Sequence, residues 1–310
     1  MFDWIKKYLS PVYAIRIASD FTTILSNNKV VLRKPSCVAK KDTYFVAGYD
    51  YVSSRYYIPI EYPIHNNRIQ NFSDVEFMVK YFIKKILKHN WIKPQILLIY
   101  PSPYSEMEQR AVCSIFNEIT NRVNFYSDSR ALIYSLSRFK ELNNLIIINI
   151  DYDCVKLVIA KNDNILVEKE IDQGFYSIKE FICNKLSVKY NIKFGFKSID
   201  SFLKEYQTKE SLNVYGLCKT TNLPQEIHVS SDEIKCLIHQ GSVCLSHIIN
   251  QIIDKLKCDY GIEEALIISE CGYIHALAQQ LKLPFELIEN SSSIMLEGAF
   301  IAHQYNIKKK

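Results

Sequence analysis

Residues 145–171 read LIIINIDYDCVKLVIAKNDNILVEKEI, and this stretch decides the fold. Its apolar runs, separated by short polar turns, predict three consecutive strands. The same pattern opens the chain, where β-like runs lie at 12–18, 22–25 and 29–32. Helices and single buried strands follow both meanders. The pattern of a β-meander followed by an α/β segment therefore occurs twice along the chain. This repetition indicates two related α/β domains with a boundary near Asn143–Asn144.

The elements that follow each meander are predicted from apolar periodicity and from helix-capping residues. Segments 73–76 (SDVE) and 105–108 (SEME) have the form of capping boxes, so each is expected to open a helix. Ser230 and Ser231 are expected to cap the longest helix. Helices are predicted at 73–89, 105–119, 128–139, 176–190, 198–206, 232–257 and from about 293, and further strands at 44–48, 95–100, 123–126, 214–217, 226–229, 265–269 and 285–288.

Glycine is scarce in this chain. The 310 residues include 8 glycines, whereas average usage of about 7% would give roughly 22. Sites that cradle phosphates rely on glycine because a Cβ blocks the close approach of backbone N–H groups to the ligand. The sequence contains no GxxxxGK[ST], no GxGxxG and no adjacent glycines, which excludes an ordinary P-loop or Rossmann site.

The remaining composition is that of a globular protein, with 48% hydrophobic residues and a net charge of +5. Lysine and arginine are dispersed, so nucleic acid is not expected as a partner. No apolar run is long enough to span a bilayer, and no signal peptide is visible. The nine cysteines are odd in number and include no C-x-x-C pair. Reduced thiols in a cytosolic protein are therefore expected, without a metal site.

Six segments, in the right order, resemble the MreB family, the rod-shape-determining actin homologues of bacteria. They are VLRKPSCVA (31–39), MVKYFIKK (78–85), the stretch from KP to YP (93–101), EQRAV (108–112), residues 190–205, and LPQEIHVSSDEI (223–234). The resemblance implies the α/β actin-like fold, shared with Hsp70 and sugar kinases, in which two domains with smaller subdomains surround a central nucleotide cleft. We therefore expect an amphipathic N-terminal segment at 1–10, a first domain at 11–143 with a subdomain at about 33–72, and a second domain at 144–310 with a subdomain at about 176–232.

Both phosphate loops of the family are altered in this chain. The first reads A-I-D-L-G-T-x-x-T in the family, and residues 14–22 here read AIRIASDFT. Arg16 stands where an acidic residue helps to hold Mg²⁺, and Ala18 replaces the glycine of the phosphate turn, before Ser19. The second loop is D-I-G-G-G-T-T in the family and NIDYDCV at 149–155 here. Its candidate site residues are Asn149, Asp151, Tyr152 and Asp153, the last three in place of glycines.

Other candidate site residues come from the same resemblance. The adenosine-side T-G-G-G matches Ser269-Glu270-Cys271-Gly272 and keeps one glycine of three. Glu108 lies at the position of the hydrolytic glutamate and is also the third residue of a capping box. The capping role is favoured, because without the phosphate loops there is nothing to hydrolyse. Asp200 and Glu205 fit a pocket that still responds to nucleotide.

These replacements predict weak or lost binding of ATP and Mg²⁺, and no ATPase activity. A carboxylate about 4–6 Å from a phosphate costs on the order of 1–4 kcal/mol, and lost backbone N–H bonds add to that cost. Arg16 either binds phosphate directly or pairs with Asp20, Asp151 or Asp153. The Asp151–Asp153 segment is expected to be a solvated hairpin turn rather than a metal site.

Two segments predict association with the inner surface of the cell membrane. The first ten residues, MFDWIKKYLS, combine an apolar face with lysines, and they either bind the membrane surface or pack on their own domain. Residues 90–94, NWIKP, are similar to the hydrophobic membrane loop of the family, and an exposed Trp-Ile suits the lipid interface. The residues expected at the membrane are Phe2, Trp4, Ile5, Leu9, Trp91 and Ile92.

The sequence thus predicts a cytoplasmic, membrane-peripheral, actin-like scaffold that serves cell shape. Its expected partners are further copies of itself or an MreB-type homologue, the inner membrane surface, and cell-shape or wall-synthesis proteins. Two alternatives stay open: an ATP-dependent filament ATPase with a rewired pocket, and a non-filamentous adaptor of division or pilus assembly. Sugar kinases share the fold but need the glycine turns and acidic residues that are missing here.

Overall fold

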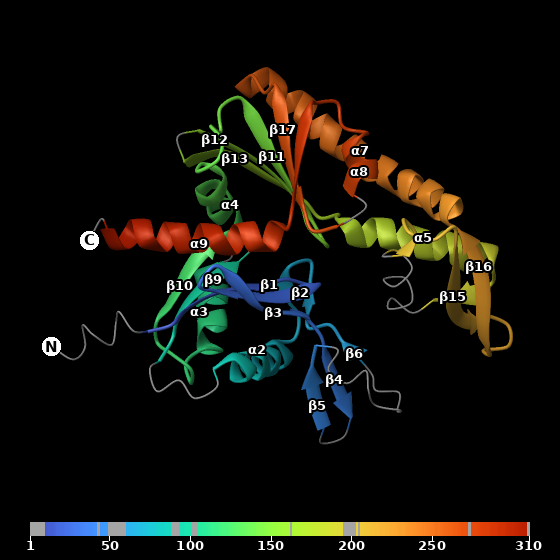
Figure 1. Cartoon of the computed structure of the whole chain (residues 1–310), viewed down its shortest axis with the longest axis horizontal. Helices are drawn as coiled ribbons and strands as arrows, with labels where there is room; N and C mark the ends of the chain where they lie inside the picture. Colours follow the sequence, from blue (N-terminus) through green and yellow to red (C-terminus); the bar gives the residue numbers. More distant parts are fainter. Residues whose placement is uncertain are drawn as a thin grey trace. The chain divides into compact units, whose positions relative to one another are not determined.

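The computed structural model describes residues 10–41, 44–48, 60–87, 93–100, 105–161, 163–194, 203, 205–271 and 274–308 (Figure 1). The chain forms two compact units. The first comprises Met1–Asn143, Val158–Val167 and Asn290–Lys310, and the second comprises Asn144–Leu157 and Glu168–Glu289. The described residues contain two five-stranded sheets, one in the first unit and one whose residues belong mainly to the second.

The sheet of the first unit has the strand order β10-β9-β1-β2-β3. Three of its strands, β1 (Val12–Ile17), β2 (Phe21–Ser26) and β3 (Lys29–Pro35), form the predicted antiparallel meander. The other two, β9 (Gln95–Tyr100) and β10 (Val123–Ser127), extend it as parallel strands. A meander followed by parallel strands is the arrangement that the alternation of strands and helices predicts.

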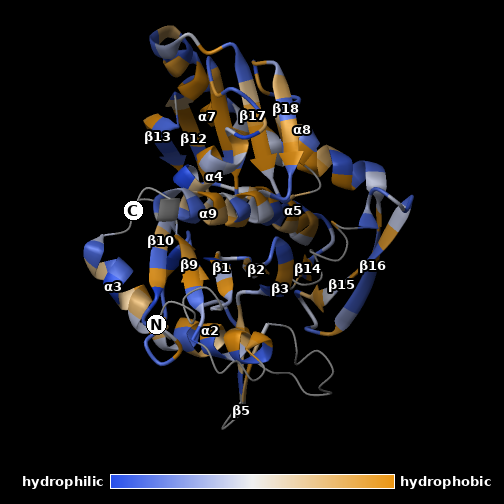
Figure 2. Ribbon diagram, turned by 60° about the vertical axis from the view of Figure 1, so that its left-hand side comes forward, coloured by the Kyte–Doolittle hydropathy of each residue, from blue (hydrophilic) through white to orange (hydrophobic). Residues whose placement is uncertain are grey.

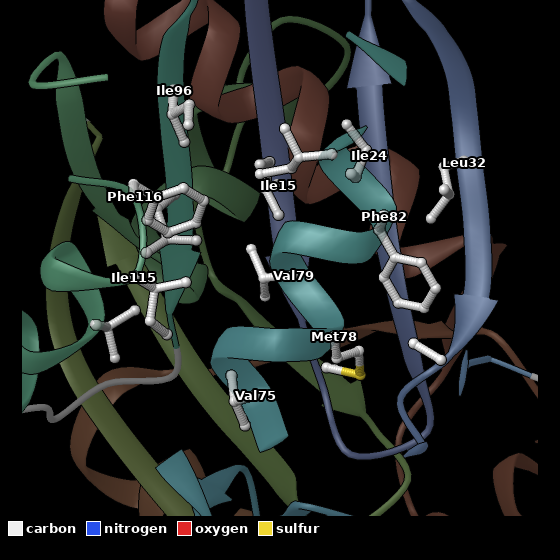
Figure 3. Packing of buried hydrophobic residues seen from close by; sticks show 14 of the residues in the cluster. Ile15, Ile24, Leu32, Val75, Met78, Val79, Phe82, Ile96, Ile115 and Phe116 are labelled. Atoms are coloured by element: carbon white, nitrogen blue, oxygen red, sulfur yellow. The ribbon is translucent and has the colours of Figure 1, made fainter. Parts of the chain in front are cut away.

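One face of this sheet packs against α2 (Phe72–Ile86), with α3 (Glu106–Ser114) beside it. Figure 2 shows that α2 carries both hydrophobic and hydrophilic residues, and its buried residues Val75, Met78, Val79 and Phe82 recur at helical spacing, so the helix has one apolar side for the sheet. The core between them is shown in Figure 3, where the labelled side chains are Val75, Met78, Val79 and Phe82 of α2, Ile15, Ile24, Leu32 and Ile96 of the sheet, and Ile115 and Phe116 after α3.

The start of α2 differs from the predicted one. Its N-cap is Asn71, whose Oδ1 accepts a hydrogen bond from the Asp74 N–H at 3.3 Å. The Ser73 hydroxyl donates to the same Oδ1 at 2.8 Å instead of capping the helix itself. The predicted capping box at Ser73 is therefore wrong. Asparagine is as good an N-cap residue as serine, and it is the side chain of Asn71, two residues earlier, that accepts from the first turn of the helix. The predicted helix end at 89–90 lies outside the described residues.

The other face of the first sheet is covered by α4 (Asp128–Leu136) and α9 (Ser291–Lys308) (Figure 1). The two helices cross closely at Gly298, where an added Cβ would lie 1.8 Å from the Ala131 carbonyl oxygen. The close crossing explains why residues 290–310 group with the first unit, although the sequence alone assigns them to the second domain.

Short strands form two smaller sheets in the first unit. One has the order β5-β4-β6, from β4 (Val38–Lys41), β5 (Tyr44–Ala47) and β6 (Ile60–Glu61). The other is the hairpin of β7 (Ile64–His65) and β8 (Arg68–Ile69). Strands of two residues show no apolar alternation, so the sequence does not predict β6, β7 or β8.

The sheet of the second unit has the order β13-β12-β11-β17-β18. The predicted run of three strands is present as β11 (Leu145–Ile150), β12 (Val155–Lys161) and β13 (Asn164–Ile171). It is extended by β17 (Glu264–Ser269), parallel to β11, and by β18 (Phe285–Glu289), parallel to β17. Both units therefore have the same plan of three consecutive strands followed by two parallel ones, which confirms the predicted α/β architecture.

Helices and a small sheet complete the second unit. α5 (Phe175–Lys189) and α7 (Ser231–Tyr260) pack against each other, and α8 (Ile274–Ala278) packs against α7. The predicted cap of α7 is confirmed, since the Ser230 Oγ accepts a hydrogen bond from the Glu233 N–H at 3.2 Å. The small sheet has the order β14-β15-β16, with β14 at Ile192–Lys193, β15 at Ser211–Cys218 and β16 at Pro224–Ser230. Most of the helix predicted at 198–206 lies outside the described residues.

Asparagine occupies the turns where glycine is usual. Among the described residues, nine other than glycine have positive φ angles: Asn27, Asn28, Asn66, Asn67, Asn144, Asp163, Asn191, Asn222 and Asn290. Asparagine tolerates the left-handed region better than other residues with a Cβ. The pairs Asn27-Asn28 and Asn66-Asn67 supply the two consecutive positive φ angles that tight hairpins require. The shortage of glycine is thus largely met by asparagine.

Candidate functional site

The first altered loop joins β1 to β2 in the first unit. Arg16 is 7% exposed and lies on the sheet face covered by α9, opposite the face on which Ile15 packs against α2. Its Nη1 donates a hydrogen bond to the Ser292 Oγ at the start of α9, at 2.9 Å. The sequence therefore places a buried guanidinium, rather than a carboxylate, at the end of β1.

The loop itself is closed by its own hydrogen bonds. The Ala18 N–H donates to the Phe21 carbonyl at 3.2 Å, and the Phe21 N–H donates to the Asp20 Oδ1 at 2.7 Å. The Ser19 hydroxyl oxygen accepts from the Asn67 N–H of the β7–β8 hairpin at 3.2 Å. Ala18, Ser19 and Asp20, all within the described part of the chain, have negative φ angles. The backbone of this turn therefore has a conformation that residues with a Cβ adopt without strain.

Glu108 is part of a complete capping box at the start of α3, as predicted. Its Oε2 accepts from the Ser105 N–H and from the Ser105 hydroxyl, each at 2.8 Å, and Arg68 lies 3.4 Å from Oε1. The Ser105 hydrogen bonds hold the pKa of the Glu108 carboxyl below its usual range. A carboxylate stabilised in its ionised form is a weak base, so this geometry serves the helix cap. A role of Glu108 in hydrolysis stays a prediction.

The second altered loop joins β11 to β12 in the second unit. It is the predicted hairpin turn, but it is buried rather than solvated, with Asp151 and Asp153 both less than a tenth exposed. The reason is its packing on the start of α5. The Phe175 N–H donates to the Asp151 carbonyl at 3.1 Å, and a Cβ on Gly174 would lie 2.4 Å from that oxygen. The Asn149 Nδ2 donates to the Asp151 Oδ2 at 3.0 Å.

A buried lysine that the sequence analysis did not single out lies beside this loop. Lys179 of α5 is 3% exposed, and its Nζ donates to the Tyr152 hydroxyl at 3.4 Å. The Tyr152 ring also packs edge-on against Tyr176, with centroids 5.7 Å apart. Lys179 falls on the apolar stripe of α5 that includes Phe175 and Ile182. A lysine within an apolar stripe is the signal that could have revealed it.

The remaining candidates lie in separate places of the second unit. After β17, the Ser269 Oγ donates to the Ile150 carbonyl at 3.0 Å and accepts from the Cys271 N–H at 3.2 Å, which ties the segment at Glu270 to β11. Glu205 is about half exposed and forms an ion pair with Lys209 one helical turn later.

Part of the predicted site lies outside the described residues. These positions are Asp200 and Gly272 of the nucleotide site, and Phe2, Trp4, Ile5, Leu9, Trp91 and Ile92 of the membrane surface. Within the second unit, the structure brings Asn149, Asp151, Tyr152 and Asp153 together. The pairing of Arg16 with Asp151 or Asp153, which would join the two units, stays a prediction. Within the described ranges, no helix is long and apolar enough to cross a membrane.

Two α/β units with the same strand plan define an actin-like protein, and comparison with solved structures agrees. MreB5 of Spiroplasma citri bound to AMPPNP is similar with a TM-score of 0.78 and 19% identity, over 97% of this chain and 98% of that one. The MamK double helical filament is similar with a TM-score of 0.71 and 12% identity, over 95% of this chain and 99% of that one.

The chain belongs to the MreB/Mbl family. The model of the MreB/Mbl protein family matches residues 18–308. The cell shape-determining protein Mbl of Bacillus cereus is 22% identical over 258 residues, which is 77% of this chain and 77% of that protein. The resemblance inferred from the six sequence segments is therefore confirmed.

The actin-like fold implies magnesium-bound ATP, and weak or lost binding of this ligand stays a prediction. The end of β1 presents the Arg16 guanidinium, which repels a cation. The Glu108 carboxylate is already engaged in the helix cap. Among the residues that the structure describes, no three His, Cys, Asp or Glu side chains are grouped so as to hold a metal ion.

Proposed function

We propose that this MreB/Mbl-family chain is a membrane-associated cytoskeletal scaffold that self-associates and serves cell-shape determination, with weak or lost binding of Mg-ATP. The family match over residues 18–308 carries the cytoskeletal part of the proposal. Likeness to a protein solved as a double helical filament supports self-association. Filament contacts depend on buried surface rather than on hydrolysis, so they can persist when the nucleotide site changes.

The two altered loops support the nucleotide part of the proposal. Arg16 lies where the family holds Mg²⁺ through an acidic residue, and the second loop carries two buried carboxylates, Asp151 and Asp153. Each carboxylate facing a phosphate costs about 1–4 kcal/mol. Two such terms add to about 2–8 kcal/mol, which weakens binding by about thirtyfold or more at about 1.4 kcal/mol per tenfold.

Sedimentation and electron microscopy of the purified full chain test the scaffold. We expect polymers in the absence of nucleotide, and the same polymer yield when Mg-ATP is added. Thermal shift with Mg-ATP is the matching binding measurement, and we expect no saturable increase in Tm below millimolar concentration. Sub-millimolar affinity for Mg-ATP would contradict the nucleotide part of the proposal. A chain that stays monomeric under all these conditions would contradict self-association and favour the soluble adaptor.

Liposome sedimentation tests membrane association. We expect the full chain to pellet with vesicles of bacterial inner-membrane lipids, and we expect a variant with Trp4→Ser and Trp91→Ser to remain in the supernatant. The matched control is Phe139→Ser, which removes an exposed aromatic side chain from the turn that follows α4. Equal pelleting of the double variant and the control would show that the two tryptophans do not anchor the chain.

One observation favours a second candidate, an ATP-dependent filament ATPase with a rewired pocket. A solved structure with a TM-score of 0.78 to this chain is that of a protein bound to AMPPNP. Measurement of phosphate release separates the two candidates. Steady release of phosphate that depends on Mg-ATP and rises with polymer mass would establish the ATPase, and its absence would support the scaffold.

A further inference from the structure

The helix α7, drawn in orange in Figure 1, has an exposed side whose middle part carries no formal charge. Residues 236–253 contain no lysine, arginine, aspartate or glutamate. The exposed members of this stretch, which we call the α7 face, are Cys236, His239, Gln240, Val243, Cys244, His247 and Gln251. The solvent side of a helix normally carries charged residues, whereas the centre of a protein interface is depleted of them. The composition of the α7 face is therefore that of a contact surface.

Two residues of the types that bind zinc are neighbours at the centre of the α7 face. Cys244 is a free, exposed thiol, and His247 is exposed three residues later. Residues three apart on a helix have Cβ atoms about 5–6 Å from each other. The Gln251 amide nitrogen donates to the His247 Nε2 at 2.9 Å, which leaves this ring nitrogen deprotonated, as a metal ligand must be.

One chain supplies half of a zinc site at this place. A structural zinc ion is bound tetrahedrally by four ligands, and two cysteines with two histidines are a common set. Within the ranges that the structure describes, no three His, Cys, Asp or Glu side chains come together. Cys244 and His247 therefore provide two of the four ligands, and the site is incomplete without two more. Thiolate and imidazole ligands favour zinc over magnesium or calcium.

The position of the pair on α7 identifies a second copy of the chain as the source of the missing ligands. The helix has 30 residues, and Cys244 and His247 lie symmetrically about its midpoint, with residues 231–243 before them and 248–260 after them. When two copies of α7 pair antiparallel along their whole length, Cys244 of each copy lies opposite His247 of the other. A two-fold axis then brings all four ligands together.

The two ends of α7 favour the same antiparallel pairing. Asp232 lies in the first turn and Lys257 in the last turn, and both are exposed. Antiparallel pairing therefore brings opposite charges near each other at both ends of the contact. It also places the positive end of one helix dipole beside the negative end of the other.

We propose that two copies of this chain dimerise through the α7 face around one zinc ion, which Cys244 and His247 of both copies bind. Each Cys244 thiol releases its proton to solvent as its sulfur–zinc bond forms, and each His247 binds as a neutral imidazole, so no electron is transferred. A two-fold contact of this kind closes on itself. The zinc contact therefore goes beyond the proposed self-association into filaments, and it does not rest on that proposal.

Zinc titration of the purified full chain tests the site. The chain is stripped of metal with EDTA, kept reduced, and studied below the concentration at which polymers sediment. We expect one zinc ion to bind per two chains, with light scattering showing dimers in zinc and monomers in EDTA. Co²⁺ in place of zinc should give the visible absorption of a tetrahedral site with thiolate ligands.

Variants of the two ligands separate this site from adventitious binding to other thiols. Cys244→Ser and His247→Ala should each weaken the apparent zinc affinity by at least about a hundredfold, because loss of a group that only orients a ligand already costs about 10–100-fold. Cys244→His exchanges one zinc ligand for another and should keep the zinc-dependent dimer. The matched control is Cys258→Ser, which removes another exposed thiol from the same helix and should behave like the wild type.

Thermal unfolding in EDTA shows whether these variants are folded. Because Cys244 and His247 are exposed, each variant should keep the wild-type Tm without metal. The inference is overturned if zinc binds without dimerisation, if binding saturates at one ion per chain, or if Cys244→Ser dimerises in zinc like the wild type. Polymers that form equally in zinc and in EDTA, without a zinc-dependent dimer, would overturn this inference while the proposed function stands. Zinc-dependent dimers without polymers would support it and contradict filament formation.

Discussion

Replacement of the buried Lys156 by methionine should destabilise the second unit more than any surface change. Lys156 lies on β12 and is 1% exposed, and its Nζ is 3.9 Å from the Glu168 Oε1 and 3.4 Å from the Glu170 Oε2. The two glutamates are alternate residues of β13, so they share a face of the sheet. Methionine keeps most of the volume and the apolar stem of lysine but removes the charge.

The magnitude follows from these distances. With an effective dielectric constant of about 20, each ion pair contributes about 4–5 kcal/mol of gross attraction, most of which offsets the cost of burying the lysine. Removal of one partner of a buried pair typically costs about 3–5 kcal/mol. Glu168 and Glu170 are 24% and 31% exposed, so water can still reach their carboxylates. We therefore expect a loss of about 2–3 kcal/mol for Lys156→Met.

Urea unfolding followed by circular dichroism measures this loss. The matched control is Lys169→Met, an exposed position on β13 between the two glutamates, where a change within about 0.5 kcal/mol is expected. The triple variant Lys156→Met, Glu168→Gln and Glu170→Gln should recover most of the stability, because it removes all three charges together. The reasoning is refuted if Lys156→Met costs no more than Lys169→Met, or if the triple variant is as unstable as the single one.

Three further predictions follow from other contacts. Gly298→Ala should destabilise the first unit by about 3 kcal/mol, because the new Cβ would lie 1.8 Å from a backbone oxygen. The control is Gly261→Ala, whose Cβ meets no atom within 4 Å and which should cost about 1 kcal/mol because of its φ of 62°. Equal losses of stability in thermal unfolding of the two variants would contradict this prediction. Glu108→Gln should lower the free energy of unfolding by about 0.5–1 kcal/mol at pH 7. The difference from the wild type should vanish as the pH falls through the lowered pKa of the Glu108 carboxyl, because the stability that this group contributes requires its ionised form. A difference in stability that persists at pH 2 would refute the cap assignment. A hydrogen bond from the Thr220 hydroxyl is the main cause that lowers the pKa of the half-buried Cys218 thiol to about 6. Iodoacetamide should therefore label Cys218 well before Cys258 at pH 7, and the labelling rate should fall to about half of its plateau near pH 6. Equal labelling of the two thiols would contradict this.

The fold could be predicted because its signals are local and repeated. The apolar runs of 145–171 predict the three strands that the second sheet contains, and the capping box at Ser105 and Glu108 forms as expected. The start of α2 was missed by two residues because Asn71 and Ser73 are both good caps, and only the geometry decides between them. The predicted start of a helix is therefore wrong where two neighbouring residues are both good N-caps.

The candidate site was predicted less completely, because burial and long-range contacts decide it. The sequence shows that Asp151–Asp153 is a turn, but not that α5 covers it, since the contact with Gly174 joins residues far apart in the chain. Arg16 was identified, whereas its partner Ser292 lies 276 residues away on α9. Lys179 is different, because a lysine within the apolar stripe of α5 is a local pattern from which its burial can be predicted.

The asparagine turns also change how readily the backbone can move. Glycine crosses between negative and positive φ at little cost, so a glycine turn has several accessible states. Asparagine loses less entropy on folding and is held more firmly in the one well that it occupies. In this chain the hairpin turns at Asn27-Asn28 and Asn66-Asn67 are therefore less flexible than glycine turns would be. The hairpin that contacts Ser19 should hold the first loop in one conformation whether or not a ligand is bound, so that recognition depends on side chains already in place.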